Sequence, residues 1–169
     1  CGKLPETFPL KLEDNPSYLN FGGDGRNVRY AEGSYVGYRY YDTKKMPVRW
    51  AFGHGLSYTS FSYSNLRFSA DTFADGQTIC VQADITNTGK IAGKEIVQLY
   101  VADQNGTVGR PAKELKGFTK VALAPNETKT VSFTLDPRSL SYYEEKINDW
   151  FAPTGNYEII VSTSSDRKE

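Results

Sequence analysis

The sequence predicts an all-β protein, an antiparallel β-sandwich of about seven strands with an immunoglobulin-like or fibronectin-like arrangement. Three observations lead to this prediction. From about residue 59 onward, short runs alternate apolar and polar side chains, which gives each strand one buried and one solvated face. Turn-forming residues separate these runs. The first 58 residues show no such regularity and no apolar pattern with helical period, so they are expected to be irregular.

The expected strands follow one another closely through residues 59–169. The first slips in its alternation near Ser64-Asn65, and the second stops at the turn formers Asn87-Thr88-Gly89. In order, the expected strands are 61–68, 79–85, 96–101, 115–123, 131–135, a weaker one near Trp150-Phe151 or slightly earlier, and 157–161. Only the stretch 138–146 is expected to hold a helical turn, and the tail 164–169 is expected to be frayed.

Residues 1–58 form the second predicted unit of the chain. The segment is rich in Pro and Gly and has too few apolar residues to offset its own ordering entropy, so it is expected to dock onto another structure. Strand structure is expected only within 28–41, where 36–41 forms an aromatic run. A break is expected at 44–47, followed by a tight turn in which Gly53 and Gly55 permit positive φ.

Composition excludes several classes of protein. The 20 basic and 20 acidic residues balance, which gives no electrostatic reason to expect nucleic acid or an anionic membrane as a partner. No apolar run approaches the roughly 20 residues of a membrane-spanning helix. The two cysteines make neither a disulfide framework nor a zinc site, and Cys80 is expected to be a small buried residue on a strand. The first residue is Cys1 and no signal peptide is visible, which favours an excised piece, a processed chain or an internal fragment.

Several separated motifs resemble one enzyme family. The segment VGYRYYDTKKMPVRWAFGHGLSYTSFSY at 36–63 is preceded by GKLPETFP at 2–9, and YAEGSYVGYRYYD spans 30–42. Downstream stand ITNTG and AGKEIVQLYV within 85–101, RPAKELKGFTKVALAPNET at 110–128, VSFTL at 131–135 and GNYEIIVSTSS at 155–165. The sequences of these motifs and their order along the chain resemble the C-terminal region of glycoside hydrolase family 3 β-glucosidases. The resemblance implies that 1–58 is the end of an α/β sandwich domain with an interdomain linker, and that 59–169 is a fibronectin type III-like domain.

No catalytic residue can be carried over from that family. Retaining glycosidases need two opposed carboxyl groups, and no position of this sequence matches the family's nucleophile or acid/base motif. Asp24, Glu32 and Asp42 are the candidates for an independent pair, and the favoured interpretation is that they pair with Arg or accept loop N–H bonds. His54 is favoured as part of a turn rather than as a ligand, and Ser57 lacks the flanks of a nucleophile elbow. We therefore expect no catalytic, cofactor-binding or metal-binding residue in this chain.

The aromatic run offers an alternative function. If 36–41 were a strand, Tyr38 and Tyr40 would lie on one face, and this row together with Trp50 and Trp150 would form a platform for sugar rings. An independent carbohydrate-binding or adhesion module is therefore the second hypothesis. Since both faces of the run are aromatic, burial against the two neighbouring domains is the favoured interpretation.

The resemblance implies an architectural role. The whole enzyme would be a retaining β-glucosidase that acts on terminal β-D-glucosides without a metal or organic cofactor. This chain would stabilise its catalytic lobes, and alone it would be inactive. Its expected partners are those catalytic domains, with a second chain docked on residues 1–58 as a further possibility, and neither nucleic acid nor membrane. Asn105-Gly106-Thr107 and Asn126-Glu127-Thr128 match the N-glycosylation pattern in expected turns.

Overall fold

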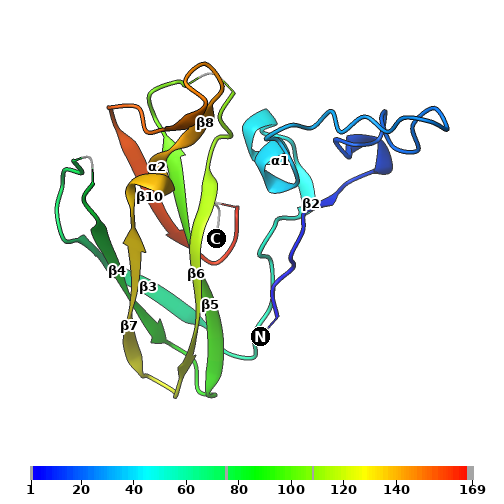
Figure 1. Ribbon diagram of the computed structural model, residues 1–169. Helices are drawn as coiled ribbons and strands as arrows, with labels where there is room; N and C mark the ends of the chain where they lie inside the picture. Colours follow the sequence, from blue (N-terminus) through cyan, green and yellow to red (C-terminus); the bar gives the residue numbers. More distant parts are fainter. Residues whose placement is uncertain (1, 75, 108, 167–169) are drawn as a thin grey trace.

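The computed structural model describes residues 2–74, 76–107 and 109–166, and in these residues two antiparallel three-stranded sheets pack face to face (Figure 1). One sheet has the order β3-β4-β7 and the other β10-β5-β6. The bounds are β3 (Phe61–Phe68), β4 (Ile79–Asn87), β7 (Thr128–Leu135), β10 (Tyr157–Ser162), β5 (Gly93–Asp103) and β6 (Glu114–Leu123). The predicted all-β, fibronectin-like sandwich is therefore confirmed.

The core lies between the two sheets and follows the alternation seen in the sequence. Val81, Ala83 and Ile85 of β4 are buried, whereas the residues between them are half-buried. They face the alternate residues of β5, of which Val97 and Leu99 are fully buried. Full burial of a Val, Leu or Ile side chain contributes about 1.5–3 kcal/mol, so this layer holds the sheets together.

Six of the seven expected strands occupy the two sheets. The slip expected in the first strand is also present, because the pairing of β3 with β4 shifts between Ser64 and Arg67 and Asn65 adopts φ 51. The weak strand near Trp150-Phe151 lies outside both sheets. It forms a small hairpin of β8 (Tyr142–Glu144) with β9 (Asp149–Phe151) at one end of the sandwich.

A four-residue helix, α2 (Pro137–Leu140), follows β7 within the region expected to hold a helical turn. Asp136 caps it, since its carboxylate accepts from the backbone N–H of Ser139 while the Ser139 hydroxyl faces the Asp136 N–H. Pro137 at the first position lacks an N–H that would need a partner.

The prediction of a strand in the aromatic run 36–41 is wrong. The chain instead forms the helix α1 (Tyr38–Lys44), which begins after Gly37 at φ 59 and ends at Lys45 in the left-handed conformation with φ 52. The end of α1 falls at the expected break at 44–47. Seven residues are too few for a stable isolated helix, so contacts with the sandwich must hold α1 in place.

The remainder of residues 2–58 is largely irregular, as expected. It contains the two-residue strand β1 (Phe8–Pro9), the short 3-10 helix η1 (Leu12–Asp14) and β2 (Val48–Trp50), which pairs with β1. No strand forms within 28–41. Figure 1 shows that the part between η1 and α1 extends away from the sandwich, while α1 and β2 lie beside it.

Two smaller predictions are also wrong. Cys80 lies on β4 but is only half-buried, because it points to the outer face of the sheet, opposite to Val81. The tail is not frayed at its start, since Ser164 and Ser165 are buried and the Ser165 N–H donates to the Phe52 carbonyl at 2.8 Å. Cys1 and residues 167–169 lie outside the described residues.

Candidate functional site: the interface between the N-terminal segment and the sandwich

Strand β5 is buried on both of its faces. Val97, Leu99 and Val101 point into the core, and the residues between them point outward, yet Gln98, Tyr100 and Ala102 are buried as well. A sandwich strand with one solvated face would expose that second set. The outer face of β5 is covered by α1 and the turn after β2, and we call this contact the segment interface.

Tyr38 is the central aromatic side chain of the segment interface. Its ring stacks on Phe52 with centroids 4.9 Å apart and meets the Tyr100 ring edge-on at 5.8 Å. Its hydroxyl accepts a 2.7 Å hydrogen bond from the backbone N–H of Leu115 on β6. Burial raises the pKa of Tyr100 far above its ordinary value, and the hydroxyl donates to Gln98. The three rings thus join α1, the turn and β5.

Two ion pairs fasten the N-terminal segment at separate points. Lys113 contacts Asp42 of α1 at 2.9 Å, and its side chain is 9% exposed. Lys3 contacts Glu95 of β5 at 3.0 Å, with the two side chains 9% and 5% exposed. Removing one partner of a buried pair leaves an uncompensated charge, at a cost of about 3–5 kcal/mol. The pairs therefore make the segment interface specific as well as apolar.

The turn after β2 fits closely against β5. Gly53 has φ 83, and a methyl group added there would collide with the Gln98 amide. Gly55 does not have the positive φ expected for it; a side chain there would instead meet the Gly2 carbonyl. His54 belongs to the same backbone network, since its carbonyl accepts from the Leu4 N–H at 2.8 Å. The glycines serve close packing as well as the turn.

The structure places the three candidate carboxylates in different surroundings. Asp24 lies in the exposed loop, where its carboxylate accepts from the backbone N–H groups of Arg26 and Asn27, and these bonds lower its pKa. Asp42 pairs with Lys113 within the segment interface. Glu32 is half-buried in the loop before α1. Among residues 2–74, 76–107 and 109–166, no group of three or more His, Cys, Asp and Glu is arranged to hold a metal ion.

The aromatic platform expected on a strand is not formed. Tyr38 is engaged in the segment interface, and Tyr40 lies edge-on to the buried ring of Tyr41. Trp150 is covered on one face by the guanidinium of Arg138, which lies 3.0 Å from the ring centroid. The helical conformation of α1 separates side chains that a strand would have aligned.

Many large apolar side chains of the N-terminal segment remain exposed. Leu19, Phe21, Tyr30, Leu56 and Tyr58 are each 83–97% exposed. The others are Phe8, Leu10, Leu12, Tyr18, Val28, Val36 and Trp50. So many exposed apolar residues in one segment are typical of a surface that another protein part covers.

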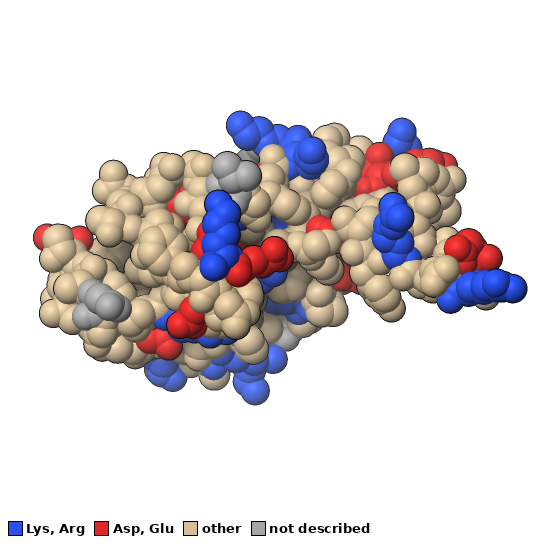
Figure 2. All heavy atoms as spheres, turned by 45° about the horizontal axis from the view of Figure 1, so that its top comes forward, with Lys and Arg blue, Asp and Glu red and all other residues tan. Residues whose placement is uncertain are grey.

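The distribution of surface charge does not indicate one kind of binding partner. Figure 2 shows basic and acidic side chains interspersed on the face that it presents, as the balanced composition indicates. In the part of the chain that the structure describes, no helix is long and apolar enough to cross a membrane.

Comparisons with known proteins agree with the resemblance drawn from the sequence. A family model described as a fibronectin type III-like domain matches residues 95–165. The thermostable β-glucosidase B of Acetivibrio thermocellus is 54% identical over 164 residues, which are 97% of this chain and 22% of that protein. The crystal structure of a Bifidobacterium adolescentis GH3 β-glucosidase superposes with a TM-score of 0.91 at 43% identity, over 97% of this chain and 24% of that one. A Kluyveromyces marxianus β-glucosidase in complex with glucose gives a TM-score of 0.88 at 43% identity, over 98% of this chain and 20% of that one.

The matches cover nearly all of this chain but only a small part of each relative. The chain spans about a fifth of the length of the relatives that it matches, and that fifth is their C-terminal region. The likeness covers nearly all of this chain, so it includes the N-terminal segment as well as the sandwich.

Proposed function

We propose that this chain is the C-terminal structural portion of a family 3 glycoside hydrolase, a retaining β-glucosidase, and that it stabilises the catalytic lobes without taking part in the chemistry. The observation that carries the proposal is the match of 97% of this chain to 22% of a β-glucosidase at 54% identity. The parent protein would hydrolyse terminal β-D-glucosides, and the sugar chemistry would take place on lobes outside this chain.

The division of the chain follows from the same proposal. Residues 1–58 would complete the α/β domain of the parent and link it to the sandwich of 59–169. The exposed apolar residues of the N-terminal segment support this division, because a neighbouring lobe would cover them. A second chain docked on residues 1–58 would cover the same surface.

The segment interface explains how the sandwich would act on the lobes. A helix of seven residues, held by an aromatic stack and by the Asp42–Lys113 pair, joins the two parts of the chain, and the Lys3–Glu95 pair adds a second attachment. A lobe that continues from residues 1–58 would therefore keep a defined orientation relative to the sandwich. Catalytic carboxyl groups in retaining glycosidases must be held about 5–5.5 Å apart, so rigid support of the lobes serves catalysis indirectly.

An activity assay tests the absence of a reactive centre. The purified chain is incubated with an aryl β-glucoside, and release of the aryl group is followed at high protein concentration. We expect no turnover above buffer, because no opposed carboxyl pair is predicted in this chain. A clear rate that disappears on Asp24→Asn, Glu32→Gln or Asp42→Asn would overturn the proposal, and Glu13→Gln at an exposed carboxylate serves as the control.

A further inference from the structure

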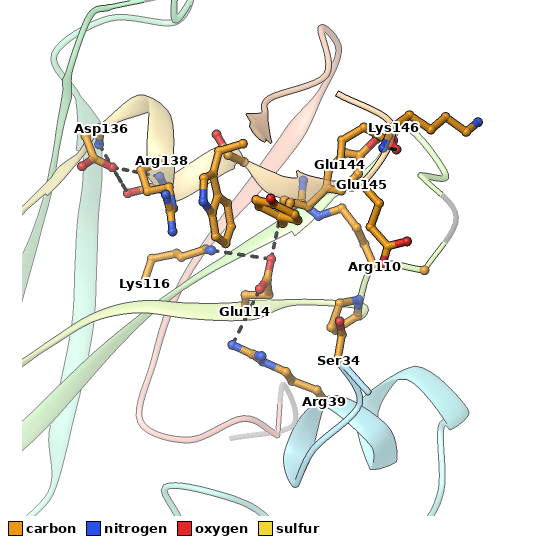
Figure 3. Close-up of a pocket in the computed structure, with 17 residues that line it drawn as sticks. Ser34, Arg39, Arg110, Glu114, Lys116, Asp136, Arg138, Glu144, Glu145 and Lys146 are labelled. Carbon is orange, nitrogen blue, oxygen red and sulfur yellow. Dashed lines mark hydrogen bonds and ion pairs between the residues drawn. The ribbon is translucent and has the colours of Figure 1, made fainter. Parts of the chain in front are cut away.

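A pocket of about 720 Å³ lies between α1 and the end of the sandwich that carries the β8–β9 hairpin. Figure 3 shows Arg39 entering it from α1, Glu114 and Lys116 from β6, and Arg110 from the loop before β6. The volume exceeds that of a single sugar ring or a similar small molecule. The pocket plays no part in the proposed structural role, and its lining is strongly charged.

Glu114 lies at the centre of three cations. Its carboxylate accepts a 2.9 Å hydrogen bond from Arg110, whose side chain is 5% exposed. Arg110 also donates to the Leu140 carbonyl at 2.8 Å and pairs with Asp103 at 3.5 Å. The guanidinium of Arg110 is thus held by three acceptors, and it is a fixed part of the pocket wall.

The other two cations are less completely paired. Arg39 and Lys116 approach Glu114 at 3.7 Å and 3.6 Å, distances longer than a normal hydrogen bond. The Lys116 side chain is only 17% exposed, so water does not fully solvate its ammonium group. Both side chains line the pocket, and an arginine and a lysine together carry more N–H donors than the Glu114 carboxylate can accept.

Lys116 owes its position to a bulge in β6. Leu99 pairs with Gly117 and the next residue, Tyr100, pairs with Leu115, so Lys116 is the extra residue between them. A bulge turns a side chain out of the regular alternation and is often found beside binding sites. Here it directs a lysine toward Glu114 at one end of the sandwich.

The charges around Glu114 leave an excess of one positive charge. Three cations (Arg39, Arg110 and Lys116) face two carboxylates, Asp103 and Glu114. Burial lowers the pKa of Lys116, Glu114 opposes this, and the positive charges of Arg110 and Arg39 lower it further. A single negative charge next to Lys116 would relieve this repulsion.

Several of the charged residues farther out contact other groups. Arg138 stacks on Trp150, and Asp136 caps α2. Glu144 accepts from the Tyr142 hydroxyl and the Lys146 backbone N–H. The outer lining has two basic residues, Arg138 and Lys146, and three acidic ones, Asp136, Glu144 and Glu145, so the excess of one positive charge is confined to the group around Glu114.

We propose that this pocket binds a small organic carboxylate, with Lys116 and Arg39 as its charge-assisted donors. A monoanion matches the excess of one positive charge in the group around Glu114, whereas a dianion would meet repulsion from Glu114. The planar guanidinium of Arg39 suits a carboxylate geometrically. The inference is independent of the proposed role as a structural portion of a glycosidase.

Glucuronate and glucose form a matched pair of probes, because they differ only in a carboxylate in place of a hydroxymethyl group. Each is titrated into the isotope-labelled chain at constant ionic strength, and chemical shifts of backbone amides in β6 and of arginine side chains are followed by NMR. We expect saturable shifts near Lys116 and Arg39 with glucuronate, in the millimolar range, and none with glucose. Equal shifts with both sugars, or shifts reproduced by sodium chloride, would overturn the proposal.

Two variants and one control assign the site. Lys116→Met keeps the apolar stem and removes the charge, and we expect it to weaken glucuronate binding at least tenfold. Lys120→Met removes an exposed charge farther along β6 and is expected to bind like the unchanged chain. Arg39→Gln, at a side chain that is 35% exposed, gives a second test if Lys116→Met does not fold. Unchanged binding in folded Lys116→Met, or in folded Arg39→Gln if only that variant can be studied, would refute the assignment.

Discussion

At the scale of single residues, Glu114 shows how one carboxylate organises several elements. Its carboxylate accepts a hydrogen bond from the Arg110 guanidinium at 2.9 Å, and it lies within 4 Å of the charged groups of Arg39 on α1 and of Lys116. Burial raises the pKa of Glu114, but the hydrogen bond from Arg110 and the charges of Lys116, Arg110 and Arg39 outweigh it, so the net shift is downward. A carboxylate with a lowered pKa stabilises the folded state when it is ionised.

The pH dependence of stability follows from the sign of this shift. The contribution of Glu114 is fully present above its ordinary pKa of 4.5 and is lost as the pH falls through the lower pKa of the folded state. Glu114→Gln is expected to cost about 1–2 kcal/mol at pH 7. The difference from the unchanged chain should shrink as the pH falls below 4.5, and urea unfolding at a series of pH values would measure it. A difference that stays constant with pH would contradict this, and Glu145→Gln is the control.

At the scale of elements, the strands of the sandwich could be predicted and α1 could not. Alternation is a local signal, and it located β4, β7 and β10 because each has one face in the core and one face turned away from it. Tyr38, Tyr40 and Tyr41 have high strand propensity, which favoured a strand. Helix α1 depends on the Tyr38 hydroxyl and on the Thr43 hydroxyl, which accepts from the Ala112 N–H. Such tertiary contacts leave no trace in the local pattern.

The run Ile96–Val101 carries a sequence signal of the segment interface. Alternation predicts an ordinary strand with one solvated face there, but Ile96, Val97, Leu99 and Tyr100 make the run nearly continuously apolar. Continuous apolar strands are buried on both faces. That pattern was enough to expect a cover over the outer face of β5, but the identity of the cover, residues 38–53, required the structure.

The N-terminal segment consists of two parts that should differ in protection. The part before α1 extends from the sandwich, and its Arg26 and Arg29 are exposed (Figure 1). From α1 onward the chain is held by the segment interface. Limited trypsin digestion should therefore cut first after Arg26 and Arg29, and cleavage after Arg39 should be slower by about tenfold or more, because it requires local unfolding of α1.

Mass spectrometry of the early products checks this order. The expected first large product begins at residue 27 or 30 and retains the sandwich. Equal early cleavage after Arg39 would show that α1 is not held by the sandwich in the isolated chain.

At the scale of the whole molecule, the sandwich is expected to fold alone but to lose stability without residues 2–58. The two core layers lie entirely within the sandwich, so residues 59–169 keep their main apolar burial. The outer face of β5, however, would expose Tyr100 and Gln98, and Glu95 would lose Lys3. Losing the aromatic stack and this ion pair is expected to lower the free energy of unfolding by about 3 kcal/mol or more.

Denaturant unfolding of the two chains measures that difference, and single substitutions attribute it. Tyr38→Ala in the full chain should reproduce a large share of the loss, because Tyr38 contacts both Phe52 and Tyr100. Tyr30→Ala is the matched control, since that side chain is 87% exposed and its removal should change stability by less than about 0.5 kcal/mol. If the truncated and full chains unfold at the same denaturant concentration, the segment interface does not couple the two parts. The sandwich would then be unable to orient a lobe that is attached through residues 1–58.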